Sequence, residues 1–237
     1  MLLANTGSGR TTATPGTSGA CPMCMAPLIP KCGLIKQWHW AHLASTECDP
    51  WVEHETEWHR EWKRCFRNDE IEVCLGPHRA DVKTARGRIL EFQHSTISAI
   101  EIQERERFYG PGLVWVVDAE PFLRNIFFHP KDGFMTFYWR WPRPSWGLAK
   151  CPVFLDTRDG WLFNLRRIYT DTPCRGWGAW KEANQLLRDF GACQAYSDAL
   201  LVEINRCGNC ARNGSGYALN SPCCFCNEFR PSMYWPT

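Results

Sequence analysis

The alternation of apolar and polar residues predicts a group of short strands in the middle of the chain. Runs rich in β-forming residues predict three strands, at 73–75, 80–83 and 89–94. Arg86-Gly87 predicts a turn that makes the last two strands a hairpin. The apolar run at 113–118 predicts a further buried strand.

Helical spacing and end signals predict the helices. Apolar and ionisable residues that recur every third or fourth position predict a helix over 52–67. Ser98 and Glu101 predict a capping box at the start of the helix that follows. Its charged side chains at 101, 104, 105 and 107 are expected on the solvent side, although Arg105 and Arg107 could also meet phosphate. Strands at 134–141 and 151–165 and a helix that Gly191 ends complete the pattern.

Composition shifts suggest the divisions of the chain. Residues 1–19 are rich in Gly, Ser and Thr and predict a disordered tail. The expected divisions are a tail at 1–19, a metal-binding module at 20–50, a core at 51–120, a β-rich extension with a helix at 121–206, and a second metal-binding module at 207–237. Aromatic residues at 134–141 with Arg140 and Arg143 suggest either stacking on unpaired bases or a packed extension; we favour packing.

Asp81, Glu91 and Gln93 are the candidate catalytic residues of the hairpin. Glu91 and Gln93 are two apart, so on a strand they share a face, and Asp81 on the other arm adds a second carboxylate. Two carboxylates on rigid strands favour Mg²⁺ or Mn²⁺, which leave room for a phosphate oxygen and a water. The alternative is that these acids are solvated, but the apolar neighbours argue against it. Asp118 is expected to cap its strand or to lie at the edge of the site.

The overall totals exclude several classes of protein. The formal charge is +2, so any surface that follows phosphates must be local. No apolar run approaches the roughly 18 residues of a membrane span, and nothing suggests export, so we expect a cytoplasmic protein. Fourteen cysteines without an export signal indicate metal binding rather than disulfides.

The first predicted metal site lies near the start of the chain. Cys21, Cys24, His39 and His42 form a C-x2-C…H-x2-H pattern that suits a structural Zn²⁺ with four protein ligands. The close spacing of the histidines favours a strand or turn over a helix. Cys32 and Cys48 are possible substitute ligands, and the alternative is a set of reduced, unligated thiols.

The second predicted metal site lies at the end of the chain. The pairs Cys207–Cys210 and Cys223–Cys226 are separated by twelve residues and predict a four-cysteine zinc knuckle, in which Cys224 could replace Cys223. The alternative is again unligated thiols. Such a module could stabilise the terminus, hold DNA or bind a protein partner.

Several segments in the same order resemble the competence protein CoiA-like family. They are CPMC, WHWAH, ETEWHREWK, HRADV, ILEFQHSTIS and WVVD. The resemblance implies an α+β chain with an α/β core, namely a restriction-endonuclease-like, PD-(D/E)XK mixed sheet flanked by helices, with small zinc-binding modules on either side. It implies metal-dependent DNA cleavage, with Asp81 and Glu91 as ligands of the magnesium ion.

The same resemblance implies that the helix at 52–67 supports the site. Glu55 is the expected additional acid, with Glu57 as the second choice. His59 would orient water, bind phosphate or simply pack, and Lys63 is expected to be solvated. Gln93 stands where many relatives of the wider fold carry a lysine, and a neutral amide cannot stabilise charge as an ammonium can.

Two functions therefore remain from the sequence. The first is a Mg²⁺-dependent DNA endonuclease that acts in DNA processing, recombination or defence. The second is an inactive relative of the nuclease fold that serves as a zinc-stabilised DNA- or protein-binding module. The intact Asp81, Glu91 and Gln93 triplet favours the enzyme, while the strandedness of the substrate and the oligomeric state stay open.

Overall fold

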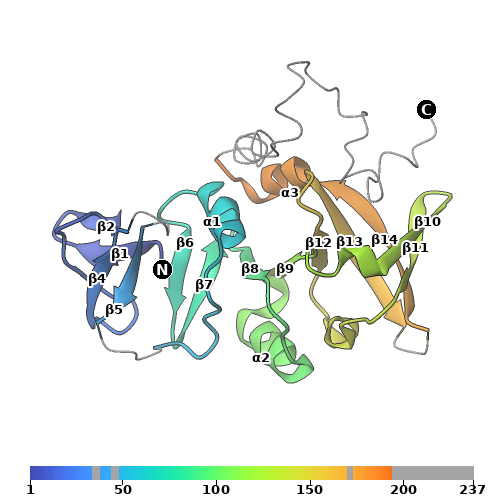
Figure 1. Ribbon diagram of the computed structural model, residues 1–237, viewed down its shortest axis with the longest axis horizontal. Helices are drawn as coiled ribbons and strands as arrows, with labels where there is room; N and C mark the ends of the chain where they lie inside the picture. The colour runs from blue at the N-terminus through green and yellow to red at the C-terminus, as the bar shows by residue number, and fades with distance from the viewer. Residues whose placement is uncertain (34–37, 44–47, 170–172, 194–237) are drawn as a thin grey trace, which may run out of the picture.

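The computed structural model describes residues 1–33, 38–43, 48–169 and 173–193. Within these residues the chain is mixed α+β, with a small sheet beside a large one (Figure 1). The small sheet has the order β2-β1-β3-β4-β5, built from Leu3–Thr6 (β1), Gly9–Thr12 (β2), Gly19–Ala20 (β3), Pro27–Lys31 (β4) and His39–His42 (β5).

The small sheet corrects the prediction of a disordered tail at 1–19. Two of its strands, β1 and β2, lie in this segment, β3 begins at its last residue, and Leu3 and Ala4 are buried. A side chain at Gly19 would bring its Cβ within 2.9 Å of the Ala4 Cβ, so the glycine permits close strand contact. The segment has few apolar residues, yet those few pack against residues such as Leu28 and Trp40, which lie later in the chain.

The large sheet contains nine strands of the described residues in the order β10-β11-β14-β13-β12-β9-β8-β7-β6. They are Ile71–Leu75 (β6), His78–Lys83 (β7), Ile89–Gln93 (β8), Leu113–Asp118 (β9), Ile126–Lys131 (β10), Phe134–Trp139 (β11), Val153–Asp156 (β12), Trp161–Tyr169 (β13) and Arg175–Glu182 (β14). β9 pairs in parallel with both β8 and β12, and the other neighbours are antiparallel. The β9–β12 pair therefore joins the expected core and extension into one sheet across residue 120.

The predicted hairpin is confirmed as β7 and β8. Val82 pairs with Leu90, and the turn closes with a bond from the Gly87 N–H to the Thr84 carbonyl oxygen at 2.8 Å. Gly87 has φ 76°, which a glycine adopts without strain. All five residues of β8 and all six of β9 are buried, as the apolar runs predicted.

Three helices of the described residues cover the two faces of the large sheet. They are Glu57–Arg64 (α1), Ala99–Tyr109 (α2) and Ala183–Phe190 (α3), with short 3-10 turns at Gly110–Gly112, Leu123–Asn125 and Pro144–Leu148. α1 and α3 pack on one face of the central strands, and α2 packs on the other (Figure 1). Ser98 caps α2 by accepting from the Glu101 N–H at 3.1 Å, and Gly191 ends α3 at φ 76°, as expected. The other half of the predicted capping box is replaced, because the Glu101 carboxylate pairs with Arg105.

The helix predicted over 52–67 is shorter than expected. Thr56 is its N-cap: the Thr56 Oγ1 accepts from the His59 N–H, and the His59 ring Nδ1 accepts from the Thr56 N–H at 3.1 Å. This reciprocal cap begins the helix at Glu57, so Glu55 lies in the extended segment before it.

A single buried carboxylate attaches α1 to the sheet. Trp58 and Trp62 lie one turn apart and both donate their indole N–H to Asp156 Oδ2 on β12, at 2.7 and 2.8 Å. Asp156 is fully buried. This contact fixes the rotation of α1, and with it the direction in which His59 and Lys63 point.

We expect Asp156→Ala to lower the free energy of unfolding by about 3 kcal/mol or more, because two buried indole N–H groups lose their acceptor. Asp156→Asn should have a smaller effect, since its carbonyl oxygen can still accept from the indoles. Urea unfolding measures both variants. An unchanged midpoint for Asp156→Ala would mean that the other contacts of α1 hold the helix without this carboxylate.

Candidate functional site

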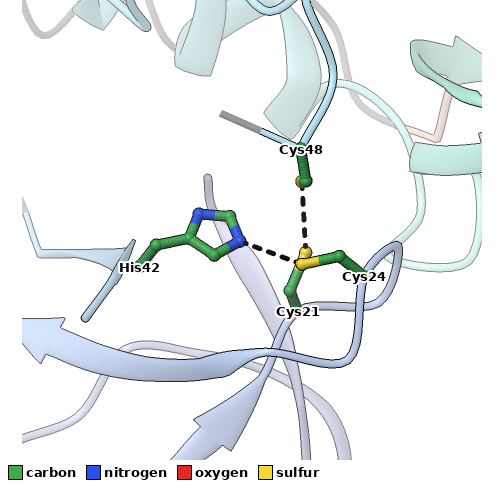
Figure 2. Close-up of side chains that lie close together, drawn as sticks. All are labelled: Cys21, Cys24, His42 and Cys48. Atoms are coloured by element: carbon green, nitrogen blue, oxygen red, sulfur yellow. Dashed lines mark hydrogen bonds between the residues drawn. The ribbon is translucent and has the colours of Figure 1, made fainter. Parts of the chain in front are cut away.

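Four side chains of the small sheet and the segment after it form a cluster of metal-ligand type. Cys21 and Cys24 lie in the turn between β3 and β4, His42 ends β5, and Cys48 follows. The candidate ligand atoms all lie within 4.8 Å of one another, and the close-up shows them converging on one point (Figure 2). The cluster is therefore a single site rather than separate thiols.

The distances within the cluster suit tetrahedral zinc. The Cys21 and Cys48 Sγ atoms are 3.7 Å apart, and the Cys24 Sγ lies 3.3 Å from the His42 Nε2. Zn–S bonds of about 2.3 Å place two sulfur ligands of a tetrahedron about 3.8 Å apart. The cluster can therefore hold a zinc ion with four protein ligands, which leaves no open position for chemistry.

The turn that carries the first two cysteines is fixed by the backbone. The Cys21 N–H donates to the Ala26 carbonyl oxygen, and the Met25 N–H donates to the Cys21 carbonyl oxygen, both at 2.9 Å. Met25 has φ 60°. A backbone hydrogen bond at Ala26 lowers the pKa of Cys24. The lowered pKa favours the thiolate form of Cys24, which is the form that binds metals.

Burial shifts the pKa values of the other two candidate ligands, Cys48 and His42. Burial, together with the nearby Cys21 and Cys24, raises the pKa of Cys48 to about 12, so this thiol needs a cation to become a thiolate. Burial and the charge of Arg79 lower the pKa of His42. The histidine is thus held in the neutral form that binds metals.

The structure differs from the expected ligand set at one position. His39 is not part of the cluster, and Cys48, the named substitute, completes it. His39 and His42 are three apart on β5, so their side chains point to opposite sides of the strand. His39 instead lines a neighbouring cavity.

This cavity, of about 560 Å³, lies between the segment before α1 and strands β6 to β8. Four of the five expected catalytic residues line it, namely Glu55, His59, Asp81 and Glu91. The hairpin pattern predicted that Asp81 and Glu91 meet, and the residues at 55 and 59, which the resemblance added, line the same cavity. Gln93 is not among the lining residues.

Asp81 and Glu91 lie side by side on β7 and β8. The Asp81 N–H donates to Glu91 Oε1 at 3.3 Å, and the Phe92 N–H donates to Asp81 Oδ2 at 2.9 Å. Burial, followed by the negative charge of Asp81, raises the pKa of Glu91 to about 8. Two carboxylates that repel each other in a partly enclosed cavity are a suitable site for a divalent cation.

Lys63 contradicts the expectation of a solvated side chain. It is 4% exposed, and its Nζ lies 2.9 Å from Asp81 Oδ1, 2.9 Å from Glu55 Oε1 and 3.4 Å from Glu72 Oε1. Burial favours the neutral amine, but the three carboxylates together raise the pKa of Lys63 above its ordinary value. The cavity therefore contains a permanent ammonium beside Asp81.

Arg105 was expected on the solvent side of its helix and is instead buried. Its Nη1 donates to Glu91 Oε2 at 3.0 Å, and its Nη2 donates to the Trp51 carbonyl oxygen at 2.7 Å. An ion pair with Glu101, one turn earlier on α2, holds the guanidinium in this direction. The inward face of α2 thus supplies the counter-charge of Glu91.

Glu53 is a site residue that the sequence analysis missed. Its carboxylate accepts from the His94 N–H at 2.9 Å, from the Gln93 Nε2 at 3.2 Å and from the Ser95 N–H. Burial raises its pKa, but these bonds and the His59 ring outweigh burial and lower it to about 2. The alternation of acids at 53, 55 and 57 was the available signal, since an extended segment turns alternate side chains to one side.

His59 and Gln93 are held by protein partners rather than directed freely into the cavity. Because His59 Nδ1 accepts from the Thr56 N–H, its proton lies on Nε2, which is 3.2 Å from both Glu53 Oε2 and the Phe92 carbonyl oxygen. Gln93 Oε1 is buried without a hydrogen-bond partner in the described residues. Both residues therefore support the strand ends around Glu91.

The remaining candidates lie outside the cavity or at its rim. Asp118 ends β9, accepts from the Glu120 N–H at 3.2 Å and pairs with His94 and Arg158, so it caps the strand and is not a cavity residue. Glu57 lies at the rim and pairs with Arg60 and Arg64.

Residues 17–50 match the family model of the competence protein CoiA N-terminal domain. This segment contains all four members of the Cys/His cluster, so the match supports a CoiA-family relationship through the metal-binding module. No curated protein and no solved structure matches the chain.

Two further expectations concern the rest of the chain. The proposed knuckle ligands Cys207, Cys210, Cys223 and Cys226 lie outside the described residues. None of the described helices is long and apolar enough to cross a membrane.

We expect Cys48→Ser to lower the zinc content of the purified protein by about one equivalent, because three ligands hold the ion poorly. Cys32→Ser and His39→Ala should keep the wild-type content. Elemental analysis of the full chain measures the difference. Zinc loss in His39→Ala with retention in Cys48→Ser would contradict the ligand set.

The Glu53 carboxylate gives a pH-dependent prediction. Its pKa in the folded protein lies below its ordinary value of 4.5, so its contribution is present above that pH and lost as the pH falls toward about 2. Glu53→Gln should lower the free energy of unfolding by roughly 2 kcal/mol at neutral pH.

Urea unfolding at a series of pH values tests this. The difference from wild type should shrink as the pH falls below about 4.5, whereas the exposed control Glu57→Gln should show little difference throughout. A difference that grows on acidification would contradict the assignment.

Proposed function

We propose that this cavity is the active centre of a metal-dependent DNA endonuclease of the CoiA type. The observation that carries the proposal is the pair Asp81 and Glu91, which lie on adjacent strands in one cavity with the Lys63 ammonium 2.9 Å from Asp81. Two carboxylates and a cation around an accessible space form the set that metal-assisted phosphodiester cleavage needs.

The order of elements supports a restriction-endonuclease-like core. α1 precedes the meander β6, β7 and β8, and α2 then crosses to β9, which is parallel to β8. Asp81 lies on the second strand of this meander and Glu91 on the third. The position of the acids on rigid strands favours a site with fixed geometry.

The carboxylates fit a magnesium or manganese ion. Asp81 and Glu91 offer oxygen ligands; burial first, and then the charge of Asp81, raises the pKa of Glu91 to about 8, and a bound divalent cation would favour the carboxylate form. When bound, the metal would polarise a phosphate oxygen and lower the pKa of a water. Arg105 keeps Glu91 Oε2 oriented, and Phe92 N–H does the same for Asp81 Oδ2.

Lys63 supplies the positive charge that Gln93 lacks. Its Nζ faces the cavity from α1 and sits within hydrogen-bond distance of Asp81 and Glu55. An ammonium there can hold a phosphate oxygen or stabilise the charge that develops during cleavage. Gln93, with its unpartnered Oε1, would instead accept from a water behind the strand end.

The family match gives the proposed role. The matching family is named for competence, so we place the activity in the processing of DNA during uptake or recombination. The zinc module would be structural, and any C-terminal knuckle would contact a protein or DNA. We assign the protein to the cytoplasm, where thiols stay reduced; no disulfide joins the cysteines of the described segments.

Cleavage of supercoiled plasmid and of circular single-stranded DNA tests the proposal. With Mg²⁺ or Mn²⁺ present, Asp81→Asn should lower the rate more than about hundredfold, because the metal loses a charged ligand. Asp69→Asn, an exposed aspartate on the surface, is the matched control. Magnesium should be omitted rather than chelated, because a chelator would also remove zinc.

A second variant in the same assay tests the contribution of the Lys63 ammonium to cleavage. Lys63→Met alone leaves buried carboxylates without a counter-charge and should unfold easily. Lys63→Met combined with Glu72→Gln removes one positive and one negative charge, and this protein should fold but cleave poorly. If Asp81→Asn or the folded double variant cleaves DNA at the wild-type rate, the assignment of the site is wrong. If the wild-type protein binds DNA but does not cleave it, the binding-module alternative is favoured.

A further inference from the structure

The far end of the large sheet has an outer face made of aromatic and basic residues. Directly opposed residues of antiparallel strands share a face. The register therefore aligns two rows across β10, β11, β14 and β13: Phe127, Tyr138, Arg175 and Tyr169 in one, and His129, Thr136, Trp177 and Arg167 in the next. Lys131 and Phe134 continue this face beyond the second row.

The aromatic side chains of this face are exposed although they lie on a sheet. Tyr169, Phe127, Phe134 and Trp177 are 48%, 45%, 40% and 39% exposed. Phe127 stacks on Tyr138 with centroids 5.9 Å apart, and Phe134 meets the edge of Trp177 at 6.0 Å. They form a continuous platform beside a hollow of about 720 Å³.

The core of this part of the sheet is built on the opposite face. Phe137 and Phe163 are buried there, and their rings lie against the backbone of Gly176 and Gly178. A Cβ at either glycine would come within 2.3 to 2.8 Å of a ring carbon. The exposed aromatic residues are therefore not needed to fill the core.

The charge of the outer face has a single sign. Arg167, Arg175 and Lys131 contribute positive charge, and Arg167 also lies over the Tyr169 ring at 5.7 Å. No acidic side chain belongs to the two rows, and no ion pair joins these three cations to a carboxylate in the described part of the chain. Asp132 lies in the turn beyond the strand ends.

We propose that this face binds single-stranded nucleic acid. Aromatic rings offer stacking surfaces for unpaired bases, and interleaved cations offer contacts for the phosphates. Rows about 7 Å apart along the strands suit an extended strand whose bases are separated. A duplex hides the faces of its bases and would leave the exposed rings without stacking partners, so the single strand fits the combination of rings and cations best.

This inference does not depend on cleavage, because the face lies on strands β10, β11, β14 and β13 and the carboxylate cavity lies beside β6 to β8. It adds a binding site and a strandedness to the proposed nuclease. A platform of this kind would hold an unpaired strand at one end of the sheet while the cavity acts at the other.

Fluorescence anisotropy with the full chain in magnesium-free buffer tests the proposal. The probes are a labelled oligothymidylate of about 15 nucleotides, the matching duplex, and an abasic oligonucleotide of equal length. Wild type should bind oligothymidylate more tightly than either other probe. Trp177→Ala should weaken oligothymidylate binding at least about tenfold but leave abasic binding nearly unchanged, because only the stacking is lost.

The controls separate stacking, charge and fold. Trp38→Ala removes a comparably exposed tryptophan, 48% exposed, from the small-sheet side and should bind as wild type. Arg175→Gln should lower the slope of log affinity against log salt by about 0.7. Thermal melting should show that Trp177→Ala folds as wild type, and Trp177→Phe should retain most of the affinity.

The results distinguish this proposal from the nuclease. Asp81→Asn should bind oligothymidylate as wild type, so lost cleavage with retained binding concerns the cavity alone. Three results would overturn the proposal. Trp177→Ala could bind oligothymidylate as tightly as wild type, wild type could bind the abasic probe as tightly as oligothymidylate, or wild type could bind no nucleic acid. The third result would indicate that the face binds a protein partner instead.

Discussion

A buried lysine holds together the parts of the chain that form the cavity. The Lys63 ammonium meets carboxylates from three places: Glu55 before α1, Glu72 on β6 and Asp81 on β7. Removing one partner from such a network leaves uncompensated buried charge, which typically costs about 3–5 kcal/mol. The geometry of the cavity is therefore enforced by electrostatics rather than by apolar packing alone, and α1 must keep the orientation that Asp156 gives it.

Glu72 also connects this network to the small sheet. Its carboxylate accepts from the N–H groups of Leu2 and Leu3 at 3.0 Å, and Lys63 and Arg79 overcome the effect of burial to lower its pKa to about 2. Glu72 itself has φ 50° and lies between the paired residues Ile71 and Val73, so a local irregularity of β6 turns it toward the junction. Glu72 thus links the N-terminal strand of the small sheet to the Lys63 network of the large sheet.

The sequence predicted those features that depend on neighbouring residues. The β7–β8 hairpin, the Ser98 cap, the Gly191 helix end and the convergence of Asp81 with Glu91 follow from local pattern and from strand periodicity. The predictions that were wrong concern features that depend on residues far away in the sequence. Arg105 and Lys63 are buried only because carboxylates from distant segments meet them, and the strands within 1–19 form only because Trp40 and Leu28 cover them. The local sequence pattern does not predict the burial of a side chain when the residues that bury it lie far away in the sequence.

The Cys/His cluster has a consequence for the cavity through Cys48. This residue begins the segment that leads past the buried Asp49, which accepts from the Arg79 N–H at 2.8 Å, to Glu53 and Glu55 in the cavity wall. Thiolates are open to oxidation, and an oxidised thiol no longer binds metal. Oxidation of the cluster would release this segment at Cys48, so the shape of the carboxylate cavity would depend on the redox state of the surroundings.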